Sequence, residues 1–251
     1  MKKIFLYILA GSLCFSACKK DDDVENYVEP EDIGVQNTYD DQSIQKFLDA
    51  NYLDTQGNIK PFSATDTADD NYKKLSQLAP VTLPSGVIYI KRANAQPEDA
   101  PATAPGKTIG ATDITRIMMR AKTYLGANTN GDVAFISGTD MTGYNTIDVS
   151  GSPVIDPKFY YIDPLNDPLI TQATTDAAKQ PSYYVIEGYN EALQKFKAFD
   201  QTDGSPYNLQ GVIIVPSRAA FARDAHYNYS GYSFRNRTFV FNFQVYKTTA
   251  R

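Results

Sequence analysis

The chain has 251 residues, 24 of them basic and 29 acidic, so its formal net charge at pH 7 is −5. An acidic chain without basic clusters is unsuited to nucleic acid, and one histidine with two cysteines is too few for a zinc site built from these residues. The roughly 200 residues beyond the N-terminal region are enough for one substantial core, or for one core with a small appendage.

The first residues have the features of a secretion signal and not of a folded element. Two lysines precede an apolar run at 4–15, which is too short to remain in a bilayer as a spanning helix. Two small residues then precede Cys18. We therefore predict a signal peptide over residues 1–17, and no later segment is apolar for long enough to span a membrane.

This small-small-Cys ending resembles the lipobox of bacterial lipoproteins, in which the cysteine is lipidated and becomes the mature N-terminus. The resemblance implies lipidation of Cys18, and a diacylated N-terminus is a stable membrane anchor. Cys14 is a poorer candidate because the bulky Leu13 precedes it. Cleavage before Cys18 discards Cys14, so with Cys18 carrying lipid the mature chain has no free thiol. The alternative is a plain signal peptide with Cys18 as an ordinary thiol.

Residues 18–40 are predicted to be the lipid anchor and a flexible acidic tether, because this polar stretch cannot bury apolar surface. Without residues 1–17 the chain keeps 22 basic and 29 acidic residues, a formal charge of −7. The sequence Cys-Lys-Lys-Asp-Asp-Asp at 18–23 resembles the surface-export signals of lipoproteins in Bacteroidetes. That resemblance implies an outer-membrane protein exposed on the cell surface, and a solvated linker is the alternative.

Residues 41–80 are predicted to form a helical N-terminal extension that packs against the main domain. The segment 41–53 places apolar side chains at helical spacing, namely Ile44, Phe47, Leu48 and Tyr52. A second helix is expected over 69–78, where Tyr72, Leu75 and Leu78 are apolar.

The main domain is predicted to begin at residue 84 with a strand over 87–91. A proline-rich connection at 95–106 leads to a long strand at roughly 114–125. Asn130-Gly131 is a turn signal, and the returning strand is expected at 133–136.

Residues 138–181 are rich in Asp, Pro, Gly, Thr and Asn, which predicts a long irregular insertion. A strand-turn-helix joint follows at 185–193, with Tyr189, Ala192, Leu193 and Phe196 on one helix face. A buried strand is expected at 212–215. In the last strand, Phe239, Phe241, Phe243 and Val245 alternate with other residues, so one strongly apolar face lies across a core. These elements predict an α+β fold, with an antiparallel sheet packed on one helix.

Several well-known site patterns are absent from the sequence. His226 is the single histidine, and no Gly-x-Ser-x-Gly motif accompanies it for a serine-histidine-aspartate triad. There is no Gly-rich dinucleotide loop and no phosphate loop. The acidic run at 21–23 and the pair Asp200 and Asp203 are more typical of solvated loops than of a calcium site. We therefore predict no cofactor and no metal, and any catalysis is expected to need neither.

The segment from 84 to 247 resembles FKBP-type peptidyl-prolyl cis-trans isomerases. The central stretch, Val-Ile-Glu-Gly-Tyr-Asn-Glu-Ala-Leu at 185–193, is similar to the family's Val-Ile-x-Gly-Trp-x-x-(Gly/Ala)-(Leu/Val). Other family-like stretches occur in the expected order at 84–90, 124–136, 215–222 and 236–245. The resemblance implies an FKBP-like antiparallel sheet wrapped on a short helix, spanning 84–251 with the insertion at about 138–181.

The resemblance also implies a pocket lined by Tyr124, Phe135, Val185, Ile186, Tyr189, Phe221 and Phe241. In the family, the Val-Ile pair lies at the pocket edge, where a backbone N–H meets a substrate carbonyl. The aromatic residue after the glycine forms the floor beneath a proline ring. Resonance opposes rotation about the X-Pro bond with a barrier of ~18–20 kcal/mol. An apolar pocket favours the twisted, less dipolar state over the planar one, so it needs no acid or base.

Four departures from the family pattern bear on turnover. Ile136 stands where the family has an aspartate, Phe221 where a tyrosine donates to substrate, and Tyr189 where the floor is an indole. The loop at 231–238 lacks the family's Ile-Pro-Pro. One lost hydrogen bond costs ~0.5–1.5 kcal/mol, about tenfold in rate at most. Several losses together are expected to leave binding with little turnover.

The sequence therefore predicts a lipoprotein that assists the folding of envelope or surface proteins as a weak prolyl isomerase. The alternative is a non-catalytic FKBP-like lipoprotein that binds peptides, folding proteins, glycans or host factors. The expected partners are proline-containing peptides or unfolded proteins and the membrane, and we expect a monomer. The pocket aromatics are also interpretable as ordinary core residues, most of all Phe241.

Overall fold

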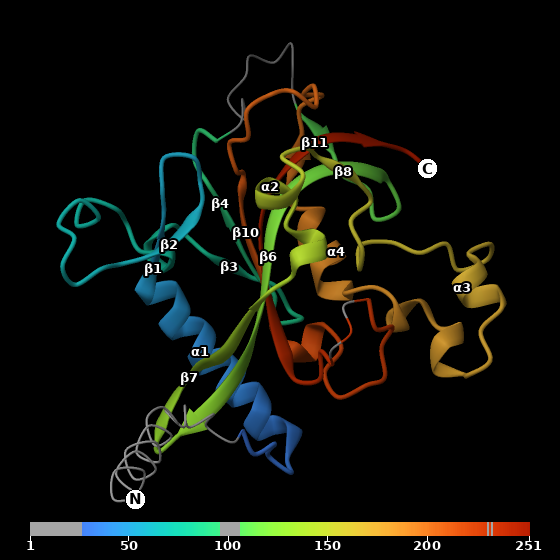
Figure 1. Ribbon diagram of the computed structural model, residues 1–251, viewed down its shortest axis with the longest axis horizontal. Helices are drawn as coiled ribbons and strands as arrows, with labels where there is room; N and C mark the ends of the chain where they lie inside the picture. Colours follow the sequence, from blue (N-terminus) through green and yellow to red (C-terminus); the bar gives the residue numbers. More distant parts are fainter. Residues whose placement is uncertain (1–26, 96–105, 230, 232) are drawn as a thin grey trace, which may run out of the picture.

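The computed structural model describes residues 27–95, 106–229, 231 and 233–251. Cys18 and the whole predicted signal peptide lie outside these residues. The centre of the molecule is an antiparallel sheet in which the C-terminal strand lies between two others (Figure 1). Its strands, in spatial order, are β3 (Val81–Thr82), β4 (Ile88–Lys91), β10 (Gly211–Val215), β11 (Arg237–Thr249), β6 (Ile114–Thr129) and β7 (Asp132–Asp140), with β8 (Val154–Ile155) beside β6.

The remaining elements are short apart from the first helix. The α-helices are α1 (Ile33–Ala50), α2 (Thr146–Val149), α3 (Pro168–Thr171) and α4 (Glu187–Leu193). Two small sheets pair β1 (Asn51–Leu53) with β2 (Ile59–Pro61), and β5 (Lys107–Thr108) with β9 (Lys197–Ala198). Single 3₁₀ turns are η1 (Leu75–Gln77), η2 (Thr142–Tyr144), η3 (Ala177–Lys179), η4 (Pro181–Tyr183) and η5 (Ser217–Ala219). These helices and antiparallel strands make an α+β fold.

The sheet separates two hydrophobic clusters. Because successive side chains of a strand point to opposite faces, alternate residues of β11 enter different clusters. Phe239, Phe241 and Phe243 pack toward α4, whereas Val240 packs toward α1. Figure 1 shows α1 alongside the β6–β7 hairpin and α4 near the centre of the molecule. The apolar alternation predicted for the last strand is confirmed.

The first helix is longer at its start than the sequence predicted. It begins at Ile33, after Asp32, whose side chain accepts a hydrogen bond from the Gly34 N–H at 2.7 Å. Residues 33–40, predicted as tether, are therefore helical. Helical spacing of apolar residues did not indicate this turn because the residues it buries are polar, Gln36 and Asp40 among them. At the other end, residues 51–53 form β1 and not helix.

The prediction of a second helix over 69–78 is wrong. Only η1 is regular there, and Leu75 is its one buried residue. The Tyr72 ring stacks on Tyr52 at 4.5 Å, and Lys74 forms an isolated β-bridge with the same residue.

The hairpin of β6 and β7 matches its sequence signal. Asn130 and Gly131 have φ of 52° and 91°, the left-handed values that a tight hairpin turn requires. Both strands are longer than predicted, and β7 continues to Asp140, inside the predicted insertion. The rest of the insertion contains η2, α2, β8, α3 and η3, so it is less irregular than its composition indicated.

Residues 27–31, also predicted as tether, are bonded to the loop that precedes β11. Arg235 binds the Glu29 carboxylate through Nε at 2.7 Å and Nη2 at 2.8 Å. The Asn236 amide donates to Glu29 Oε2 at 2.8 Å, and Arg223 donates to the carbonyls of Pro30 and Glu31. We call this set of bonds the N-terminal latch.

A buried carboxylate fixes α1 to the sheet. Asp40 Oδ2 accepts the Ser217 N–H at 3.0 Å, and Oδ1 accepts the Gln36 amide at 2.9 Å. The same amide donates to the Gly126 carbonyl at 2.9 Å. A Cβ on Gly126 would lie 2.8 Å from Asp40 Oδ1, so only glycine lets the helix approach β6 this closely.

The buried carboxyl of Asp40 makes stability depend on pH. Burial raises its pKa above the ordinary 3.8, and the bonds from Ser217 and Gln36 only partly oppose this. The folded state then keeps a proton that the unfolded chain has released, so the free energy of unfolding falls as pH rises from 3.8 through the raised pKa. Urea denaturation across this window should show that slope in the wild type. A slope of equal size in Asp40→Asn would contradict this assignment.

Candidate functional site

The structure divides the predicted pocket residues between the two faces of the sheet. Tyr124 and Phe135 stack on each other at 4.9 Å, and Phe47 of α1 lies 5.6 Å and 6.0 Å from their ring centres. They belong to the cluster on the α1 face. On β6, Ile117, Met119 and Ala121 enter the opposite cluster, and a side chain at an even position such as 124 faces away from it.

Four other predicted residues come together on the α4 face: Ile186, Tyr189, Phe221 and Phe241. Tyr189 packs on Phe241 with ring centres 4.2 Å apart, and all four are buried. Val185 is half-buried at the edge. The seven predicted residues therefore do not line one pocket.

The glycine of the central motif is required by close packing. Gly188 lies in the first turn of α4, where a Cβ would stand 2.6 Å from Val87 Cγ2 and 2.8 Å from the Ala219 carbonyl oxygen. Because Gly188 has no Cβ, α4 can pack against β10 and the segment after it. This packing places Tyr189 in the core. The preceding Val185-Ile186 pair is not a strand, since only Val185 forms a bridge, with Phe159.

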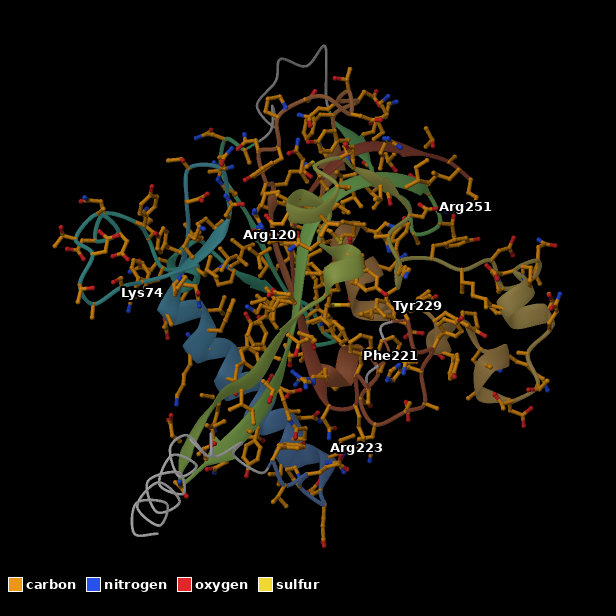
Figure 2. All side chains as sticks on the ribbon, in the orientation of Figure 1. Lys74, Arg120, Phe221, Arg223, Tyr229 and Arg251 are labelled. Atoms are coloured by element: carbon orange, nitrogen blue, oxygen red, sulfur yellow. The ribbon has the colours of Figure 1, made fainter. Side chains whose placement is uncertain are left out.

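Residues of the insertion fill the space beside Tyr189 and Phe221. Tyr160 meets Tyr189 edge-on at 6.4 Å, and Phe159 meets Phe221 edge-on at 5.5 Å. The Ile186 N–H, which the FKBP resemblance assigns to a substrate carbonyl, donates to the Phe159 carbonyl at 2.8 Å. Figure 2 shows Phe221 and Tyr229 close together below α4, and Phe159 contacts both rings.

Phe159 and Tyr160 are the residues that sequence reasoning missed. The available signal was the aromatic run Phe-Tyr-Tyr-Ile at 159–162, inside a stretch otherwise rich in loop residues. Phe159 has a φ of 63°, a conformation rarely adopted by a bulky side chain and worth ~1–3 kcal/mol of strain. The surrounding rings and the bond to Ile186 hold it there.

The hydroxyl of Tyr189 is buried and has no hydrogen-bond partner within the described part of the chain. Burial raises the pKa of Tyr189 well above its ordinary value, so the group is neutral at physiological pH.

His226 has a structural role in the same region. Its Nε2 accepts the Phe234 N–H at 2.9 Å, which leaves the proton on Nδ1, 3.2 Å from the Tyr227 carbonyl. The ring packs on Phe221 at 4.8 Å. Among the described residues, no group of three or more His, Cys, Asp or Glu side chains is placed to hold a metal ion.

Several cavities lie outside this closed cluster, and two of them have largely apolar walls. One, of about 580 Å³, lies on the α1 face beside Phe47, Tyr124 and Phe135. Its polar side includes Arg120, which binds Asp148 of α2 at 2.8 Å and 2.6 Å and lowers the pKa of that carboxyl to about 2 (Figure 2). The other, of about 570 Å³, lies along the outer side of α4 and includes Val185.

Comparison with known proteins finds weak structural similarity and no match by sequence. No protein-family model and no curated protein matches this chain. Among solved structures it is similar to one described as the crystal structure of FkpA from Escherichia coli, with 14% sequence identity and a TM-score of 0.33. The match covers 68% of this chain and 52% of that one, so it spans about half of the FkpA chain. This TM-score is too low to establish a shared fold. In the part of the chain that the structure describes, none of the helices has the length and apolar character of a membrane span.

Proposed function

We propose that this protein is a non-catalytic binding lipoprotein of the bacterial envelope, with an FKBP-like core that holds unfolded or proline-containing protein segments. The observation that carries this proposal is the hydrogen bond from the Ile186 N–H to the Phe159 carbonyl. In the proposed family, that N–H would meet a substrate. Here the Phe159 carbonyl occupies that position, while cavities with apolar walls elsewhere, the two described above among them, are open for binding.

The FKBP-like core is supported by the order of the sequence motifs and by the short α4 packed against an antiparallel sheet. Cys18 as lipid anchor rests on the lipobox-like sequence alone. The outer-membrane location and surface exposure rest on the Cys-Lys-Lys-Asp-Asp-Asp sequence at 18–23. The leader at 1–17 and the N-terminal extension also rest on the sequence, and they belong to the proposal with the anchor and its location. The tether is not proposed for residues 27–40, because they form the N-terminal latch and the start of α1.

A second candidate function is prolyl isomerase activity after residues 157–161 withdraw from the cluster. One observation favours it. The Tyr189 ring lies 4.2 Å from Phe241, so an aromatic floor of the kind expected for a proline-binding pocket is assembled beneath the insertion.

Isomerisation of peptides that vary the residue before proline would separate the two functions. We expect that residues 19–251 do not accelerate cis-to-trans isomerisation. The peptides should then isomerise with the uncatalysed time constant, which is on the order of tens to hundreds of seconds. Tyr189→Phe keeps the ring and the fold, and Tyr189→Ala removes the floor. Acceleration that survives in Tyr189→Phe but is lost in a folded Tyr189→Ala would overturn the non-catalytic proposal and favour the isomerase. Absence of both turnover and binding of unfolded segments would exclude both.

A further inference from the structure

We infer that the cavity on the outer side of α4 binds unfolded protein segments that combine apolar and cationic side chains. This inference rests on the proposed binding function and names its site and its ligand class. We call the cavity the α4 groove. It is lined mainly by residues 160–165 on one side, and by Pro181, Val185 and the outer residues of α4 on the other.

The walls of the α4 groove are largely apolar and reach the surface. Tyr161, Ile162, Pro164 and Leu165 follow one another along one wall. The Leu165 side chain is 80% exposed, and apolar residues left at the rim of a cavity are typical of interaction sites. Covering these side chains would remove apolar area from water, which is the main source of affinity at such a site.

The rim of the α4 groove is acidic. Asp163, Glu187 and Glu191 line it, and the described lining residues include no lysine or arginine. None of these three carboxylates takes part in an ion pair within the described ranges. Glu191 accepts the Ser85 hydroxyl at 2.6 Å, and Asp163 accepts the backbone N–H groups of Leu165 and Asn166. Arg251 lies 4.0 Å over the Tyr161 ring, so it offsets part of the charge at the Asp163 end, and the two glutamates leave the rim negative. Negative charge beside low-dielectric walls attracts cations and repels anions.

The spacing of the acids fits an extended ligand. Glu187 and Glu191 are four residues apart on α4, so they stand one above the other on one helix face. Asp163 belongs to a different lining segment, residues 160–165. A segment with basic residues on either side of an apolar one can therefore place its cations at the rim and its apolar side chain between the walls. A second copy of this acidic chain fits the rim poorly, because its net charge is −5.

The α4 groove is already formed. Asn190 at its floor donates to the carbonyls of Ala111 at 2.8 Å and Tyr160 at 3.2 Å. Tyr160 in turn donates to the Asp113 carbonyl at 3.0 Å. A wall held by these bonds loses little conformational freedom when a ligand enters, so less of the interaction energy is spent on ordering the site.

Fluorescence anisotropy with residues 19–251 tests this inference. Three labelled peptides share one apolar sequence and carry either lysine, glutamine or glutamate at the flanking positions. We expect the lysine peptide to bind most tightly, the glutamate peptide not to bind, and added salt to weaken binding. The double variant Glu187→Gln with Glu191→Gln should lower the affinity for the lysine peptide about tenfold. Leu165→Ser should lower the affinities for the lysine and glutamine peptides by the same factor.

Asp66→Asn with Asp70→Asn is the matched control. It removes the same charge from exposed positions in the loop between β2 and η1, on the other side of the molecule from α3 in Figure 1. Affinity independent of peptide charge, or undiminished by the groove variants, would overturn the inference and leave the binding function standing. Failure of every peptide to bind would reject the proposed function as well.

Discussion

Replacing Phe159 by alanine is expected to lower the free energy of unfolding by about 3–5 kcal/mol, the usual cost of deleting a fully buried aromatic ring. The ring contacts Phe221, Tyr229 and Phe234 at 5.5, 4.7 and 5.4 Å, so its removal leaves a void that several elements border. Alanine does not relieve the backbone, because a φ of 63° is unfavourable for any residue with a Cβ. Urea denaturation measures the loss.

Phe62→Ala is the matched control for this prediction. Phe62 is only half-buried and packs on Tyr52 at 4.9 Å, so the same truncation there should cost less than half as much. A loss below about 1 kcal/mol in Phe159→Ala would show that the insertion does not complete the core. The proposed self-occupied site would then lose its support.

Asp40→Ala is expected to lower the free energy of unfolding by about 2–5 kcal/mol at neutral pH. The change leaves the Ser217 N–H and one Gln36 N–H without an acceptor. Each buried N–H that lacks a hydrogen bond costs about 1–3 kcal/mol. Relief from burying a charge offsets part of this loss.

The adjacent Asp41→Ala supplies the control for Asp40→Ala. Asp41 forms an exposed ion pair with Arg218 at 2.8 Å, which is worth about 0–1 kcal/mol. Chemical denaturation and the helical signal of α1 would be followed together. Equal losses in the two variants would contradict the role of Asp40 in fixing α1 to the sheet.

The fold was predictable from the sequence where one physical pattern dominated. The phenylalanine alternation of β11 and the Asn130-Gly131 turn each specified their element, because period and turn chemistry are local. The start of α1 was not predictable in this way. Its buried residues are polar and bond to Gly126 and Ser217, which are distant in the sequence.

The candidate site was predictable only in part. A motif places Tyr189 after a glycine, but the strand face that receives Tyr124 depends on the register of β6 with β11, where Tyr124 pairs with Thr238. The residues that fill the site, Phe159 and Tyr160, belong to an insertion whose composition is typical of a loop. Its position depends on contacts such as Phe159 with Val185, which no local pattern specifies.

The N-terminal latch has a mechanical consequence. A pull along the chain from before Tyr27 is resisted first by the bonds of Glu29, Pro30 and Glu31 to Arg223, Arg235 and Asn236. Those partners flank the loop that carries Tyr229 and Phe234, the two rings packed against Phe159. Tension at the proposed membrane anchor would therefore reach the aromatic cluster and the start of β11 together, because Asn236 directly precedes Arg237, the first residue of that strand.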